Sequence, residues 1–139
     1  MDHEAHEAHE WVGSLSPHIE RVAKIVVDAG FRVHRALGPG LLESTYEHCL
    51  AHALTQMGVA VRRQVGLPIV FEGLTLDAGY RLDLLVEEVV VVEVKAVEAL
   101  TRLHWAQLHT YLKLSGHSLG FLMNFNVPMF RQGLKRLVY

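Results

Sequence analysis

The sequence is poor in cysteine, in long apolar runs and in net charge, and each shortage excludes a class of protein. Cys49 is the only cysteine, which excludes internal disulfides and cysteine-based zinc sites and fits a small buried residue in an apolar helix. The longest apolar runs, such as residues 89–92, are far shorter than the roughly 20 residues of a membrane span, and no N-terminal stretch resembles a signal peptide. We therefore expect a cytoplasmic protein that does not contact the membrane. A net charge of −2 with 50% hydrophobic residues excludes a disordered chain, and 139 residues predict one domain.

The small net charge conceals an uneven distribution. Residues 1–10 (MDHEAHEAHE) hold four acidic side chains and no Lys or Arg, so the remainder of the chain is mildly basic, which permits nucleic-acid contact without requiring it. This repeat has no apolar stripe, and it predicts a flexible His/Glu-rich tail over residues 1–15, before a single domain at residues 16–139. Its histidines lack the H-E-x-x-H spacing of zinc proteases. A transition-metal site at His3, His6 and His9 is the alternative interpretation of the tail.

Helix and strand signals alternate along the rest of the chain. Ser16 and Pro17 form a helix start, the segment Gly38-Pro39-Gly40 breaks the first helix, and Gly58 and Gly116 end the next two. The predicted helices span about residues 17–37, 41–57 and 101–114, and the predicted strands span residues 59–65, 67–71, 79–86, 89–96, 118–125 and 134–138. This order predicts an α/β sandwich with a mixed β-sheet.

Three charged residues interrupt two of the apolar strands. Asp83 lies in one, and Glu93 and Lys95 share a face of the next, because side chains alternate along a strand. Burial of unpaired charges is costly, so these groups either pair with one another or bind a cation. Two carboxylates and a backbone carbonyl suit Mg²⁺, and a lysine beside them suits metal-assisted phosphodiester hydrolysis. A structural ion pair of Asp83 or Glu93 with Lys95 or Arg81 is the alternative.

Two predicted helices carry further polar residues. Glu43 lies in the first turn of its helix, where the helix dipole alone stabilises a carboxylate, and Tyr46 follows one turn later. On the last helix, Gln107 and Tyr111 are four residues apart and face the same way, with His104 three residues before Gln107. A solvated helix face is the alternative interpretation of this polar stripe.

Several short motifs together resemble the GxxExxY family of the PD-(D/E)XK nuclease superfamily. They are Gly40-x-x-Glu43-x-x-Tyr46, Asp83, Glu93-Val94-Lys95 and Gln107-x-x-x-Tyr111. The segment Gly120-Phe-Leu-Met-Asn-Phe-Asn is similar to the last core strand of that family. The resemblance covers about residues 20–138 and implies a restriction-endonuclease-like sandwich, in which helices flank the mixed sheet.

The resemblance also implies a role for the matching residues. The catalytic residues would be Glu43, Asp83, Glu93 and Lys95. The ligands of Mg²⁺ or Mn²⁺ would be Asp83, Glu93, the backbone carbonyl of Val94, and Glu43 as an accessory carboxylate. Gln107 and Tyr111 would lie beside the substrate or the active site. We further expect Tyr46 and His104 to bind substrate.

The expected function is therefore that of a metal-dependent nuclease acting on DNA, with RNA as the less favoured substrate. The alternative is a non-catalytic module that keeps the nuclease fold and binds nucleic acid or a protein. A nuclease this small has little surface with which to hold a duplex, which favours a homodimer.

A metal site at Asp83 and Glu93 requires one particular strand register. A two-residue turn at Glu87-Glu88 would pair Asp83 with Val92 and place the two carboxylates on opposite faces of the sheet. We therefore predict a three-residue connection over residues 87–89, or a bulge nearby, which would put Asp83 opposite Glu93.

Overall fold

The three predicted helices are present in the computed structural model, which describes residues 15–139. In α2 (Pro17–Leu37), the hydroxyl of Ser16 accepts a hydrogen bond of 3.1 Å from the Ile19 amide, and Pro17 occupies the first helical position. The other two helices are α3 (Glu43–Gln56) and α4 (Arg102–Ser115). The predicted tail and its histidines lie outside the described residues, except for Leu15, which packs against the core. Within residues 15–139, no helix is long and apolar enough to cross a membrane.

A mixed five-stranded sheet forms the centre of the protein. Its strands, in spatial order, are β1 (Val61–Gly66), β4 (Arg81–Val86), β5 (Val90–Lys95), β6 (Leu119–Asn124) and β7 (Leu134–Val138). The β5 and β6 strands are parallel and are connected through α4, whereas the other neighbouring strands are antiparallel. The predicted sixth strand of the sequence, at residues 134–138, is thus confirmed as an edge of the sheet.

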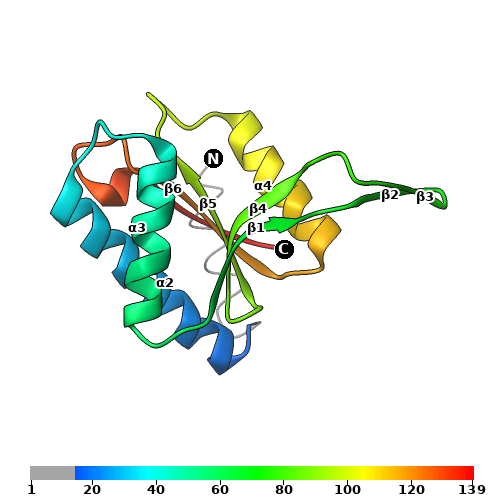
Figure 1. The fold of residues 1–139 in the computed structure, drawn as a ribbon, viewed down its shortest axis with the longest axis horizontal. Coiled ribbons are helices and arrows are strands. Elements are labelled where there is room, and N and C mark those ends of the chain that lie inside the picture. The colour runs from blue at the N-terminus through cyan, green and yellow to red at the C-terminus, as the bar shows by residue number, and fades with distance from the viewer. Residues whose placement is uncertain (1–14) are drawn as a thin grey trace.

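Helices cover both faces of this sheet, as the predicted sandwich requires. The α2 and α3 helices lie on one face, where Val26 and Leu50 join Val92 in the larger hydrophobic cluster. The α4 helix lies on the other face, where Leu108 and Leu112 pack with Val91 (Figure 1). The prediction of a restriction-endonuclease-like α/β sandwich is therefore confirmed.

A two-stranded arm extends from the sheet (Figure 1). It consists of β2 (Ile69–Phe71) and β3 (Leu74–Leu76), of which β3 was not predicted. The connecting residues Glu72 and Gly73 have φ values of 47° and 84°, as the tight turns of hairpins require. The apolar side chains of the arm, including Val70, Phe71 and Leu74, are exposed.

The register of β4 and β5 confirms the prediction made from Asp83 and Glu93. Glu87 and Glu88 form a turn with φ values of 51° and 58°, and the Val89 amide donates to the Val86 carbonyl at 3.0 Å. Val86 nevertheless pairs with Val90, so that Val89 is left out of the ladder and three residues connect the strands. The pairing of Leu84 with Val92 then places Asp83 opposite Glu93.

The turn before β7 supplies a test of this fold. A Cβ atom at Gly133 would collide with the backbone carbonyl oxygen of Asn124, an atom that cannot move without disturbing β6. We expect Gly133→Ala to lower the free energy of unfolding by about 1–3 kcal/mol or more. The control is Gly66→Ala, whose Cβ would meet only the flexible end of Arg81. Urea denaturation of both variants measures the difference, and equal stabilities would contradict this packing.

Candidate active site

Asp83 and Glu93 are joined by reciprocal hydrogen bonds between their side chains and the opposite strand. The Asp83 amide donates to Glu93 Oε2 at 2.9 Å, and the Val94 amide donates to Asp83 Oδ2, also at 2.9 Å. These bonds continue the pairing of β4 and β5 beyond the Leu84–Val92 pair. Each carboxylate is therefore oriented by backbone, and the two acidic groups that the sequence predicts to act together do lie together.

The surroundings of these two carboxylates oppose their ionisation. Glu93 is only 3% exposed, and burial, followed by the nearby charge of Asp83, raises its pKa to about 8. Burial is also the main cause that raises the pKa of Asp83 to about 6; the hydrogen bond from the Val94 amide opposes this rise, and the charge of Glu47 contributes to it. The positive charge of Lys95 lowers both pKa values but does not cancel these effects. The site thus favours the addition of positive charge.

Lys95 follows at the end of β5 and is held by α4. Its Nζ donates to Gln107 Oε1 at 3.2 Å, and Gln107 Nε2 donates to the Tyr111 hydroxyl at 3.3 Å. The second bond orients the amide so that its oxygen faces the lysine. Burial and the charge of Glu93 raise the pKa of Tyr111, which favours the neutral phenol. The predicted polar stripe of this helix therefore lies beside the carboxylates.

The predicted accessory ligand also approaches the end of β5. Glu43 is the first residue of α3, and its Oε2 accepts a hydrogen bond of 3.3 Å from the Ala96 amide. Its charge raises the pKa of Asp83, which places the two carboxylates in one electrostatic environment. Val94 lies in β5 with its amide bonded to Asp83, and the metal-binding role of its carbonyl stays a prediction.

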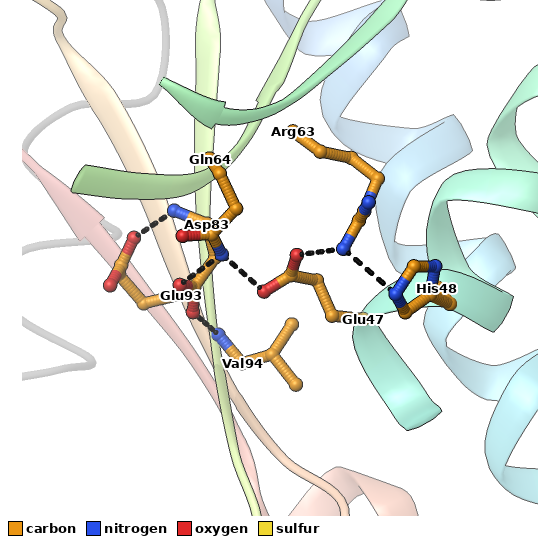
Figure 2. A network of polar contacts seen from close by, with 7 residues as sticks. All are labelled: Glu47, His48, Arg63, Gln64, Asp83, Glu93 and Val94. Carbon is orange, nitrogen blue, oxygen red and sulfur yellow. Dashed lines mark hydrogen bonds and ion pairs between the residues drawn. The ribbon is translucent and has the colours of Figure 1, made fainter. Parts of the chain in front are cut away.

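A third carboxylate near Asp83 was not predicted. Glu47, which is 5% exposed, accepts hydrogen bonds from Arg63 at 2.7 Å and from Gln64 at 2.8 Å. Figure 2 shows this network between α3 and the strand pair that carries Asp83. Glu47 lies four residues after Glu43, and this spacing places both on one helix face. That spacing is the signal that could have identified Glu47.

Asn124 is a second residue that sequence reasoning missed. It is 1% exposed at the end of β6, where its side chain bonds both the amide and the carbonyl of Val97, at 3.0 and 2.9 Å. These bonds hold the segment that follows Lys95, and the Phe125 amide donates to the Lys95 carbonyl at 3.0 Å. A polar side chain ending an otherwise apolar strand was the available signal.

Tyr46 lies in the core rather than on a surface that a substrate could reach. It is fully buried, and its ring stacks on Phe125 with centroids 4.7 Å apart. Its hydroxyl donates to the Gly38 carbonyl at 2.5 Å and accepts from the Leu41 amide at 3.1 Å. Because it is buried, we remove Tyr46 from the predicted substrate-binding residues. Its hydroxyl instead holds the loop that precedes Glu43.

His104 has a structural contact that was not expected from its position in the polar stripe. Its Nδ1 accepts a hydrogen bond of 3.0 Å from the Thr101 amide and so caps the start of α4. The ring is half-buried. Its predicted contact with substrate stays a prediction.

The family of the chain follows from comparison with known proteins. A model of the PD-(D/E)XK nuclease superfamily matches residues 20–137, which is most of the chain. The protein belongs to the PD-(D/E)XK nuclease superfamily. Comparisons with curated proteins and with solved structures gave no match. The match spans every charged residue of the site, from Glu43 to Lys95, and both helices that approach it.

The donor chemistry of the site fits the divalent metals that these nucleases typically use. Residues 15–139 contain no group of three or more His, Cys, Asp or Glu side chains already arranged around a metal position. In the same residues, however, Asp83 and Glu93 form no ion pair with Lys95 or Arg81, which argues against the alternative of a structural ion pair. Carboxylate oxygens are hard donors, which suit Mg²⁺ or Mn²⁺.

The two raised pKa values predict how stability depends on pH without metal. The folded protein retains protons on Asp83 and Glu93 that the unfolded chain releases, so their stabilising contribution is present at low pH and is lost as pH rises through about 6 and 8. We expect Glu93→Gln to be more stable than the wild type at pH 8 but not at pH 4, as measured by urea denaturation with chelator. Glu98 is exposed, so Glu98→Gln should have the same free energy of unfolding as the wild type at both pH values. The same result for Glu93→Gln would contradict the raised pKa of Glu93.

Proposed function

We propose that this protein is a divalent-metal-dependent nuclease that hydrolyses phosphodiester bonds of DNA, with RNA as the less favoured substrate. The observation that carries the proposal is the buried pair of Asp83 and Glu93, oriented by backbone hydrogen bonds beside Lys95. Membership of a nuclease superfamily supports the same chemistry. A module that only binds nucleic acid has no need of this costly arrangement.

The roles of the residues follow from their positions. Asp83 and Glu93 would hold the cation, with the Val94 carbonyl and Glu43 as further oxygen ligands. When bound, the cation would act as a Lewis acid on the phosphodiester. Lys95 orients the attacking water and offsets the negative charge that develops in the transition state. Gln107 keeps the lysine in place through its 3.2 Å hydrogen bond.

Three finer assignments accompany this proposal. The motifs that include Glu43 and Tyr46 support placement in the GxxExxY family within the superfamily. A cytoplasmic location stays a prediction. The small size of the domain supports a homodimer on duplex substrates.

Replacement of Lys95 tests the catalytic assignment. The purified protein should cut DNA or RNA with Mg²⁺ or Mn²⁺ and lose activity with chelator. Lys95→Ala should lower turnover about 100-fold or more, because the lysine acts on the transition state, and should leave the circular dichroism spectrum unchanged. Lys113→Ala removes an exposed lysine of α4 and should retain full activity. Activity that survives Lys95→Ala would refute the role of this lysine, and inactivity on every nucleic acid would favour the non-catalytic module.

Thermal melts test the metal site without knowledge of the substrate. At Mn²⁺ concentrations ten times the dissociation constant, binding should stabilise the wild type by about 1.4 kcal/mol, a shift of roughly 3–6 °C. Asp83→Asn should abolish most of this shift, yet without metal it should be at least as stable as the wild type, because it removes one of the repelling carboxylates. Asp28→Asn, in an exposed pair with Lys24, should keep the full shift. A metal-independent loss of stability in Asp83→Asn, with no shift in the wild type, would end the nuclease proposal.

A further inference from the structure

Gln64 has a backbone conformation that strands do not normally contain. Its φ is 52°, in the left-handed region that residues other than glycine rarely adopt. On either side, Arg63 pairs with Leu84 and Val65 pairs with Leu82, whereas Gln64 is omitted from the ladder although it lies opposite Asp83. Such strain persists where the surrounding structure enforces it, and it is found frequently at functional sites.

The consequence of this kink is that two consecutive side chains reach the same helix. In a regular strand, neighbouring side chains point to opposite faces. Here Arg63 and Gln64 both donate to Glu47 of α3, to its Oε2 at 2.7 Å and its Oε1 at 2.8 Å (Figure 2). The Glu47 carboxylate is thereby fixed through both of its oxygens.

The amide of Gln64 also reaches the candidate metal ligand. Its Nε2 lies 3.4 Å from Asp83 Oδ1, while the Val94 amide holds Asp83 Oδ2 at 2.9 Å. One neutral amide thus lies between the carboxylates of Glu47 and Asp83, whose charges repel each other. The amide supplies donors to both carboxylates without adding a charge that would compete with a cation.

We propose that Gln64 is a positioning residue of the active site, whose amide fixes the Asp83 carboxylate against α3 so that it is oriented before a cation binds. This inference rests on the proposed function for its metal-binding consequence, but the contact itself exists without metal. Gln64 does not ligate the cation and acts only through Asp83 and Glu47. Partners that orient a metal ligand in this way typically contribute about 10-fold to 100-fold in metal affinity or activity.

Two substitutions of Gln64 distinguish the effect of its side-chain amide from the effect of its strained backbone. Gln64→Asn keeps an amide and tolerates the left-handed conformation better than most residues, but its shorter side chain cannot span the distance to Glu47 and Asp83. Gln64→Leu keeps a similar volume and lacks donors. Arg62→Gln is the matched control. Arg62 lies in β1, two residues before Gln64, and pairs with exposed Glu88 outside the network.

Isothermal titration with Mn²⁺, on full-length folded protein, measures the metal-binding consequence. We expect both Gln64 variants to raise the dissociation constant for Mn²⁺ about 10-fold or more and to lower kcat with little change in KM, whereas Arg62→Gln should bind as the wild type does. Wild-type affinity in folded Gln64→Asn and Gln64→Leu would overturn the inference.

A double-mutant cycle in chelator tests the contact independently of the proposed function. Gln64→Leu, Asp83→Asn and the double variant are compared by urea denaturation, and we expect the shifts in midpoint to be non-additive because the side chains interact. Additive shifts would overturn the positioning role. If the wild type binds no Mn²⁺ and the cycle is non-additive, the proposed function fails while the contact between Gln64 and Asp83 stands.

Discussion

The structure depends on two hydrogen bonds of 2.9 Å that cross between β4 and β5. They join the Asp83 amide to Glu93 and the Val94 amide to Asp83, and they can form only when Asp83 lies opposite Glu93. The same register directs Leu84 and Val92 toward α2 and α3. Because a slip of one residue would turn every side chain of a strand to the wrong face, the site and the core share one constraint. The charged pair is therefore as firmly specified as the apolar packing around it.

This arrangement lowers the stability that the core would otherwise provide. Glu93 is buried next to Asp83, and backbone amides satisfy their hydrogen bonds without neutralising their charges. An apolar pair at these positions would avoid the cost of desolvation. Strongly perturbed carboxylates with a defined geometry are characteristic of functional sites, where stability is given up for chemistry. That reasoning explains why a small domain retains them in its central strands.

Local signals and charge patterning account for what could be predicted from the sequence. The Ser16–Pro17 helix start was predicted because capping depends on adjacent residues, and the register was predicted because a metal site requires Asp83 and Glu93 on the same face of the sheet. Gln64 was missed because its contacts depend on a left-handed residue inside a strand, which no periodicity reveals, whereas for Glu47 the four-residue spacing from Glu43 was a signal that was overlooked. Tyr46 was wrongly predicted to bind substrate, because a motif position does not show which way a side chain points. Whether a side chain is buried depends on how the helices and the sheet pack together.

At the level of Gln64, one site collects residues from both faces of a sheet. Leu84 packs toward α2 and α3, yet Leu82, two residues away and so expected on the same face, packs in the cluster against α4. Val61 and Val65 of β1 divide between the two clusters in the same way. The strand pair therefore changes sides at the level of Gln64 and Asp83. At such a crossing a carboxylate is within reach of groups from either layer, so Glu47 of α3 and the lysine held by α4 can act on the same residue. The motif residues are therefore widely spaced along the chain, from α3 to α4, because they come from different layers that meet at one position in the sheet.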